Sequence, residues 1–174
     1  PKDEREASDF VENTTSMLLF VTLFLTIIFI FGMPFIIQVL APGFTNNKEA
    51  YELAVHFGKI IFPYIIFISL AAHFASINNV HERFAAGAFA PAILNISFIL
   101  SLFVLTPLLP SAGHALSYGV LVGGVLQFLY LYWTVLKFYR PRIRIPVLND
   151  KLKKFFSLFL PGVVGSGVIQ LNIV

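Results

Sequence analysis

Few residues in the apolar parts of this sequence have side chains that could take part in chemistry, and these side chains are uncharged. They are uncharged polar side chains set in long apolar runs. Ser69, His73 and Ser76 follow one another at i, i+4 and i+7, which places them on one face of a helix. That face could form the wall of a water-filled cavity, or it could hydrogen-bond to a neighbouring helix. A lone His with no carboxylate partner is a weak basis for a proton relay.

Two amide side chains, more polar than the serines, lie in apolar runs further along the chain. Asn95 follows Pro91 by four residues, at what we expect to be the start of a helix, where a proline costs little. A buried Asn95 must bond to a neighbouring helix or line a cavity. Gln127 shares a helix face with Gly123 at i−4 and Thr134 at i+7, and it is a second cavity-lining candidate.

Small residues and prolines suggest where helices approach each other or bend. The pattern Gly119-x-x-x-Gly123 is the small-residue spacing that allows close helix contact. The final apolar run, residues 155–174, contains Pro161 and Gly165 in its first half and Gln170 further on. Broken helices of this kind suit alternating-access transporters, although they also occur in plain bundles. We therefore take Pro91, Gly123, Pro161 and Gly165 as hinge or packing candidates, together with Asn79 and Arg83 at the turn before Phe84, and Gln170 as a cavity candidate.

Several chemistries lack the groups that they need. No Asp, Glu, Lys or Arg lies deep in an apolar run, and the chain has no Cys. Intramembrane proteases need paired carboxylates or metal ligands, and proton-coupled carriers usually have a buried carboxylate. There is no HExxH, no P-loop and no glycine-rich dinucleotide motif. We expect no enzyme activity, no metal, no cofactor and no nucleic-acid partner.

The elements that carry these residues are predicted to be membrane-spanning helices. Hydrophobic residues make up 57% of the chain and charged residues 12%, against about 25% charged in soluble domains. No formal charge occurs in Asn13–Asn47 or in Phe84–Leu136, and about 20 apolar residues suffice to cross a bilayer. The fold class is therefore an all-α, polytopic transmembrane bundle. Its expected spans are residues 14–40, 54–78, 88–108, 115–138 and, as the start of a fifth helix, 155–174.

The distribution of Lys and Arg predicts the orientation of these spans. Alternate segments on one side, residues 1–13, 79–87 and 137–154, hold ten Lys and Arg, and the other side holds only Lys48 and Lys59. The excess places the Pro1 end, a turn at Arg83 and a basic loop over residues 139–154 in the cytoplasm. Arg83 would anchor that turn, because an Arg at the bilayer centre costs about 2.5–3.5 kcal/mol on insertion scales.

The stretch Phe62–Leu100 closely resembles the MurJ/MviN lipid II flippases of bacteria, in the MOP exporter superfamily. It carries FPY, a Ser-Leu-Ala helix, an Asn ahead of an Arg-Phe pair, and a proline-containing run that ends in Asn. LAPGF, GGVLQ and LPGVVGSGVIQLN elsewhere in the chain resemble the family in the same order. Gly87 and Ala88 stand where the family often has a further proline. The residues that carry the resemblance include Phe62, Pro63, Tyr64, Ser69, Asn79, Arg83, Phe84, Pro91 and Asn95.

The resemblance implies that this chain corresponds to spans three to six, and the start of the seventh, of a fourteen-span transporter with two lobes. It implies a lipid-linked peptidoglycan precursor, lipid II, as the transported partner, together with membrane lipids and the remaining spans of the same protein. It also implies a bacterial inner-membrane location. Another MOP exporter, for polysaccharide-lipid or drugs, is an alternative, and so is a structural membrane subunit that transports nothing.

Overall fold

The computed structural model describes residues 2–146 and residue 157, and the described part is helical with no strand. Within the described residues, four stretches are long and apolar enough to cross a membrane: Glu6–Leu40, Lys48–Val80, Phe84–Leu108 and Ala112–Val135. The predicted all-α, polytopic class is therefore confirmed. The predicted fifth span, 155–174, lies outside the described residues except for residue 157. The chain divides into two units, residues 18–140 and residues 1–17 with 141–174.

Helix α1 (Lys2–Leu40) begins earlier than the predicted first span, because the charged segment before residue 14 is also helical. That segment contains three Glu and one each of Lys, Arg and Ala, all of which are good helix formers. The helix ends at Leu40, and a short 3-10 helix, η1 (Pro42–Asn46), follows. Pro42 favours this stop because the residue before a proline is pushed away from helical dihedrals.

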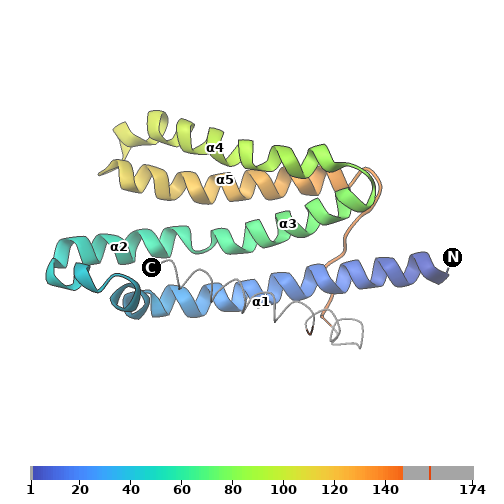
Figure 1. Cartoon of the computed structure of the whole chain (residues 1–174), viewed down its shortest axis with the longest axis horizontal. Coiled ribbons are helices and arrows are strands. Elements are labelled where there is room, and N and C mark those ends of the chain that lie inside the picture. Colours follow the sequence, from blue (N-terminus) through green and yellow to red (C-terminus); the bar gives the residue numbers. More distant parts are fainter. Residues whose placement is uncertain (1, 147–156, 158–174) are drawn as a thin grey trace. The chain divides into compact units, whose positions relative to one another are not determined.

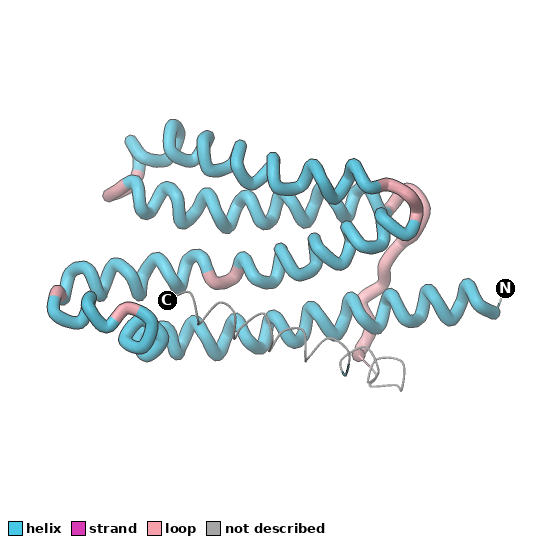
Figure 2. Tube along the Cα trace, viewed as in Figure 1, coloured by secondary structure: helices cyan, strands magenta, loops and turns pink. Residues whose placement is uncertain are grey.

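The second predicted span consists of two helices, α2 (Lys48–Ile61) and α3 (Tyr64–Val80), with a break at Phe62 and Pro63 (Figure 2). Pro63 has no N–H to continue the α-helical ladder. The chain crosses the break with shorter-range bonds: the N–H of Ile65 donates to Phe62 O and that of Ile66 donates to Pro63 O, both at 3.1 Å. The sequence had indicated one uninterrupted helix here.

A tight turn joins α3 to α4 (Phe84–Leu105). The N–H of Arg83 donates to Asn78 O at 2.9 Å, and the N–H of Glu82 donates to Asn79 O at 3.0 Å. This pair of bonds is the Schellman motif, which needs a left-handed residue just past the helix. Glu82 occupies that position with φ 58°, so a residue with a side chain fills a place that favours glycine.

The expectation that Pro91 lies at the start of a helix is wrong, because α4 begins at Phe84 and Pro91 lies inside it. The run of small residues that precedes Pro91 continues the helix back to the turn. Pro91 therefore removes an internal hydrogen bond, the one that Gly87 O would have accepted. After α4 the short helix η2 (Thr106–Leu108) leads to α5 (Ala112–Val135).

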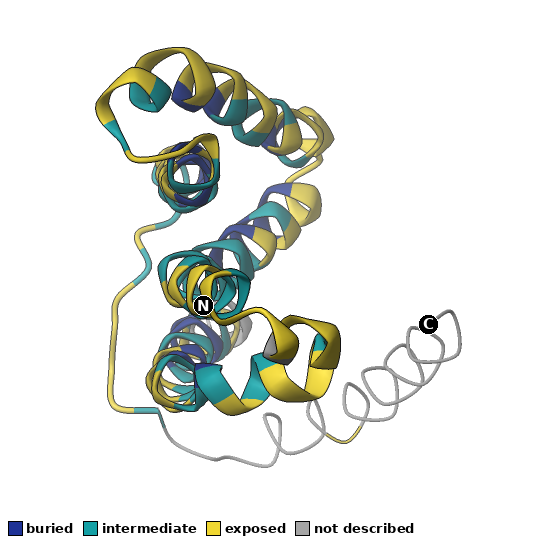
Figure 3. Cartoon of the chain, turned by 90° about the vertical axis from the view of Figure 1, so that its left-hand side faces the viewer, coloured by how far each residue is buried: buried dark blue, intermediate teal, exposed yellow. Residues whose placement is uncertain are grey.

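Helix α5 is the central element of the 18–140 unit and contacts α2, α3 and α4 (Figure 1). Its glycines allow the close approach. A Cβ at Gly119 would overlap the Ser101 side chain, and one at Gly123 would lie 2.7 Å from Leu94 Cδ1, both on α4. The buried residues lie on the sides of the helices that face each other, and exposed apolar residues lie on the outer sides (Figure 3).

We predict that Gly119→Ala destabilises the bundle by about 1–3 kcal/mol, because the added methyl has no room against Ser101. The measurement is the thermal midpoint of the detergent-solubilised protein. Gly32→Ala is the control, because a Cβ there meets nothing within 4 Å and alanine is the better helix former. Equal midpoints for the two variants would contradict the packing assigned to Gly119.

We predict that Glu82→Gly stabilises the protein by about 0.5–1 kcal/mol, since glycine adopts the left-handed conformation without the strain of a side chain. Glu82→Ala separates this effect from loss of the carboxylate, because alanine keeps the strain. A rise in the thermal midpoint with glycine but not with alanine is the expected result. A rise with both would point to the charge instead.

Candidate functional site

Gln127 on α5 connects three helices. It is buried, with 3% of its surface exposed, and its Nε2 donates to Ala90 O of α4 at 2.9 Å. The hydroxyl of Tyr64 on α3 makes a long hydrogen bond of 3.5 Å to Gln127 Oε1. Next to it, Gly124 leaves room for the Tyr64 ring, which a Cβ would overlap. The amide is thus satisfied between helices, and the acceptor that it uses is the carbonyl just before Pro91.

A second polar contact joins α3 to α5 closer to the Arg83 turn. Asn78 is fully buried, and its Nδ2 donates to Phe74 O at 2.9 Å and to Thr134 Oγ1 at 3.0 Å. Thr134 in turn donates to Leu131 O at 2.7 Å. The Asn78 Oδ1 atom has no hydrogen-bond partner among the described residues. Because its backbone carbonyl also accepts from Arg83, Asn78 connects the turn to the bundle core.

The turn itself packs on the end of α5. The His81 ring lies over Phe138 with 4.0 Å between ring centroids, and the Arg83 guanidinium lies 5.5 Å from the centre of the same ring. Lys137 makes a similar contact with Trp133, at 4.3 Å. Cations above aromatic faces are attracted by the ring quadrupole. Both Arg83 and Asn79, which we took as hinge candidates, are exposed at this turn.

Asn95 differs from Gln127 and Asn78 because it is exposed on α4, beside exposed Ile96. Its side chain makes no hydrogen bond to the described part of the chain. The same outer surface of α4 carries large apolar side chains, among them Ile99 and Phe103. An amide without a hydrogen-bond partner would cost free energy if this surface faced lipid.

The three polar residues of α3 that the sequence placed on one face differ in their burial. Ser69 and His73 are half-buried, and exposed Ser76 donates to Ala72 O of its own helix at 3.1 Å. No described contact brings this set together with Asn95 or Gln127. Of the packing candidates, Gly123 is buried between α5 and α4. Pro161, Gly165 and Gln170 lie outside the described residues.

No group of three or more His, Cys, Asp or Glu side chains gathers to hold a metal ion within the described ranges. Two residues that the structure makes prominent were not singled out from the sequence. Asn78 was taken as the end of a span, and Arg144 was counted only as one of several basic loop residues. A partner for Asn78 on α5, 56 positions away, leaves no local signal in the sequence.

The fold and these contacts define a multi-pass helical membrane protein whose helix interfaces are closed by small residues and single amides. A profile of the lipid II flippase MurJ family matches residues 1–174. The chain belongs to that family, which confirms the resemblance seen in the sequence.

Individual relatives agree. The chain is 35% identical to a probable lipid II flippase MurJ of Rhizobium meliloti (strain 1021), over 96% of this chain and 32% of that protein. It is 34% identical to a probable lipid II flippase MurJ of Rickettsia prowazekii (strain Madrid E), over 92% of this chain and 33% of the relative. It is 36% identical to the lipid II flippase MurJ of Burkholderia cenocepacia, over 68% and 23% respectively. The chain thus spans about a third of the length of the curated relatives that it matches.

We predict that Asn78→Asp destabilises the bundle by at least about 2 kcal/mol, because a carboxylate would replace a donor and face Phe74 O in a buried site. The matched control is Asn79→Asp on the next, exposed position of α3, which should cost less than about 1 kcal/mol at the helix end. Thermal midpoints in detergent measure both. Similar decreases of the thermal midpoint in the two variants would contradict the core contact assigned to Asn78.

Proposed function

We propose that this chain is part of a lipid II flippase that moves a lipid-linked peptidoglycan precursor from the inner to the outer leaflet of the bacterial inner membrane. The observation that carries this proposal is the match of the MurJ family over residues 1–174, together with relatives that are named as lipid II flippases. The proposed protein is a transporter without covalent chemistry. Its partners are lipid II, the surrounding lipids and the remaining spans of the same polypeptide.

The mechanism that fits this assignment is alternating access, in which two lobes rock about a central cavity. Rocking requires each lobe to move as a body. The contacts of α5 with α3 and α4 support that role, because Gln127 and Asn78 connect the three helices at two levels. In this proposal Pro91 and Gly165 provide local freedom, and Gly123 keeps the helices close.

The orientation proposed from the charge excess places the Arg83 turn and the basic segment after α5 in the cytoplasm. The contacts at that end support it. Arg83 and Lys137 lie against the aromatic rings of Phe138 and Trp133, an arrangement that suits the membrane interface. The same assignment puts η1 and the start of α2 on the outer side.

Asn95 is the residue of the described part that we propose lines the transport cavity. It is exposed and lacks a hydrogen-bond partner among the described residues, whereas the Gln127 amide bonds to groups of α4 and α3. A cavity that takes a sugar-peptide headgroup would supply water or substrate hydroxyls to such an amide. Ser69 and His73 on α3, both half-buried, are secondary candidates for the same role, and Gln170 stays a candidate from its sequence position.

The experiment that tests the function is replacement of the lipid II flippase in a bacterium whose own copy can be shut off. The complete gene product should restore growth and the appearance of lipid II on the outer leaflet, detected with an externally added lipid II-modifying enzyme. Failure to restore either, with the protein present in the membrane, would contradict the proposal. A related polysaccharide-lipid exporter is the specificity control, and it should restore neither growth nor the appearance of lipid II on the outer leaflet.

We predict that Asn95→Leu lowers the rate of lipid II export by about three- to fivefold, the loss expected for one hydrogen bond of about 0.6–1 kcal/mol. Its thermal midpoint should stay near that of the parent, because the side chain holds no other helix. Ile96→Leu, a neighbouring exposed position, is the matched control and should leave export unchanged. Normal export by Asn95→Leu would remove this residue from the cavity.

A further inference from the structure

The segment after α5, residues 140–146, is extended. Residues 140–146 are neither helix nor strand, and none of them makes a backbone–backbone hydrogen bond with the described part of the chain. Prolines at 141 and 146 restrict it to extended conformations. Arg140, Arg142 and Arg144 alternate along it, and Arg142 is exposed. Among the described contacts of this segment, the polar ones to α1 all come from Arg144.

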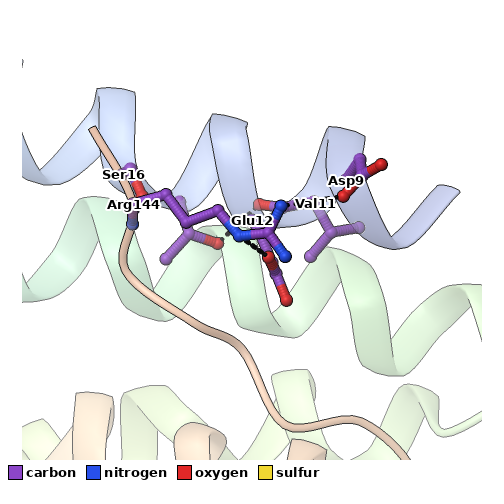
Figure 4. A network of polar contacts seen from close by, with 6 residues as sticks. Asp9, Val11, Glu12, Ser16 and Arg144 are labelled. Carbon is purple, nitrogen blue, oxygen red and sulfur yellow. Dashed lines mark hydrogen bonds and ion pairs between the residues drawn. The ribbon is translucent and has the colours of Figure 1, made fainter. Parts of the chain in front are cut away.

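Arg144 contacts three residues on one face of α1 (Figure 4). Its backbone N–H donates to Ser16 Oγ at 2.8 Å, its Nη1 lies 2.9 Å from Asp9 Oδ1, and its Nε lies 2.5 Å from Glu12 Oε2. Asp9, Glu12 and Ser16 stand at i, i+3 and i+7, so one side chain and one N–H cover about two turns of the helix.

The two ion pairs differ in their surroundings. The side chain of Glu12 is 5% exposed, whereas those of Asp9 and Arg144 are 65% and 52% exposed. Exposed pairs contribute little to stability, because water and salt screen them. A buried carboxylate needs a cation or donors close by. The pair with Glu12 should therefore provide most of the attachment, and Arg144 can return to water when the pair is broken, but Glu12 cannot.

We propose that Arg144 is a latch that fastens the segment after α5 to the first half of α1, with Glu12 as the anchor and Asp9 as an accessory contact. We call Asp9, Glu12, Ser16 and Arg144 the Arg144 latch. Within the described residues it fixes the path of the strap, by which we mean residues 141–146, so that the strap and the start of α1 move together. This inference concerns a device in the fold and does not depend on which molecule the protein transports.

The test is the rate of trypsin cleavage at the Arg142–Ile143 bond in the complete gene product, held in lipid nanodiscs and followed by mass spectrometry. Cleavage of a transiently opened segment tracks the population of the open form. Glu12→Gln should be cut about tenfold faster than the parent, the fold-change for loss of about 1.4 kcal/mol from the ion pair between Arg144 and the buried Glu12 carboxylate. Asp9→Asn is the matched control and should change the rate by about twofold or less.

A second measurement separates an open latch from an unfolded protein. Arg144→Gln leaves the Glu12 carboxylate buried without its cation, so it should lower the thermal midpoint more than Glu12→Gln does. The double variant Glu12→Gln with Arg144→Gln should recover the midpoint but remain rapidly cut. Ser16→Ala, which removes only the bond to the backbone N–H, should speed cleavage while the fold is kept.

Two outcomes would overturn the latch. One is cleavage of folded Glu12→Gln at the parent rate, which would mean that the carboxylate does not hold the strap. The other is equal acceleration by Asp9→Asn and Glu12→Gln, which would show that general surface charge controls access. Failure of the double variant to recover the midpoint would likewise contradict the role of Glu12 as the buried anchor.

Discussion

The close approach of α5 to α4 at Gly119 and Gly123 is the contact on which the rest of the 18–140 unit depends. Within a bilayer no water drives helices together, so packing and interhelical hydrogen bonds must hold them. Only backbones that lie close together allow Gln127 to reach the carbonyl of Ala90 on the neighbouring helix. The serines on α4 fit this arrangement, because Ser97 and Ser101 bond to carbonyls of their own helix and act as small residues.

Under the proposed function, the protein must hold a lobe together and still leave polar groups for a lipid-linked substrate. The described residues divide these tasks. Gln127 and Asn78 use their amides between helices, whereas Asn95 presents its amide outward from α4. The difference lies in burial and hydrogen bonding, because these side chains carry the same amide group but two are buried and one is exposed.

The sequence predicted the helical class and the family, because long charge-free runs and ordered family motifs are local signals. It misplaced the start of α4 and missed the break at Pro63, since a proline in an apolar run is compatible with either a helix start or a helix interior. It gave Asn95 and Gln127 the same role, because the sequence alone does not show whether an amide in an apolar run faces a neighbouring helix or the outside. The partners of Asn78 and Arg144 depend on contacts between residues 56 and more than 120 positions apart, for which one sequence carries no periodic signal.

The length of α1 has a consequence for its charged residues. At about 1.5 Å per residue its 39 residues extend to roughly 58 Å, whereas the hydrocarbon core of a bilayer is about 30 Å thick. Tilting absorbs only part of such an excess. The charged first turns must therefore stand in the aqueous phase as a stiff continuation of a membrane helix. A helix that extends past the bilayer in this way needs no separate loop to carry its charged residues into water, because one backbone hydrogen-bond ladder serves both its apolar and its charged parts.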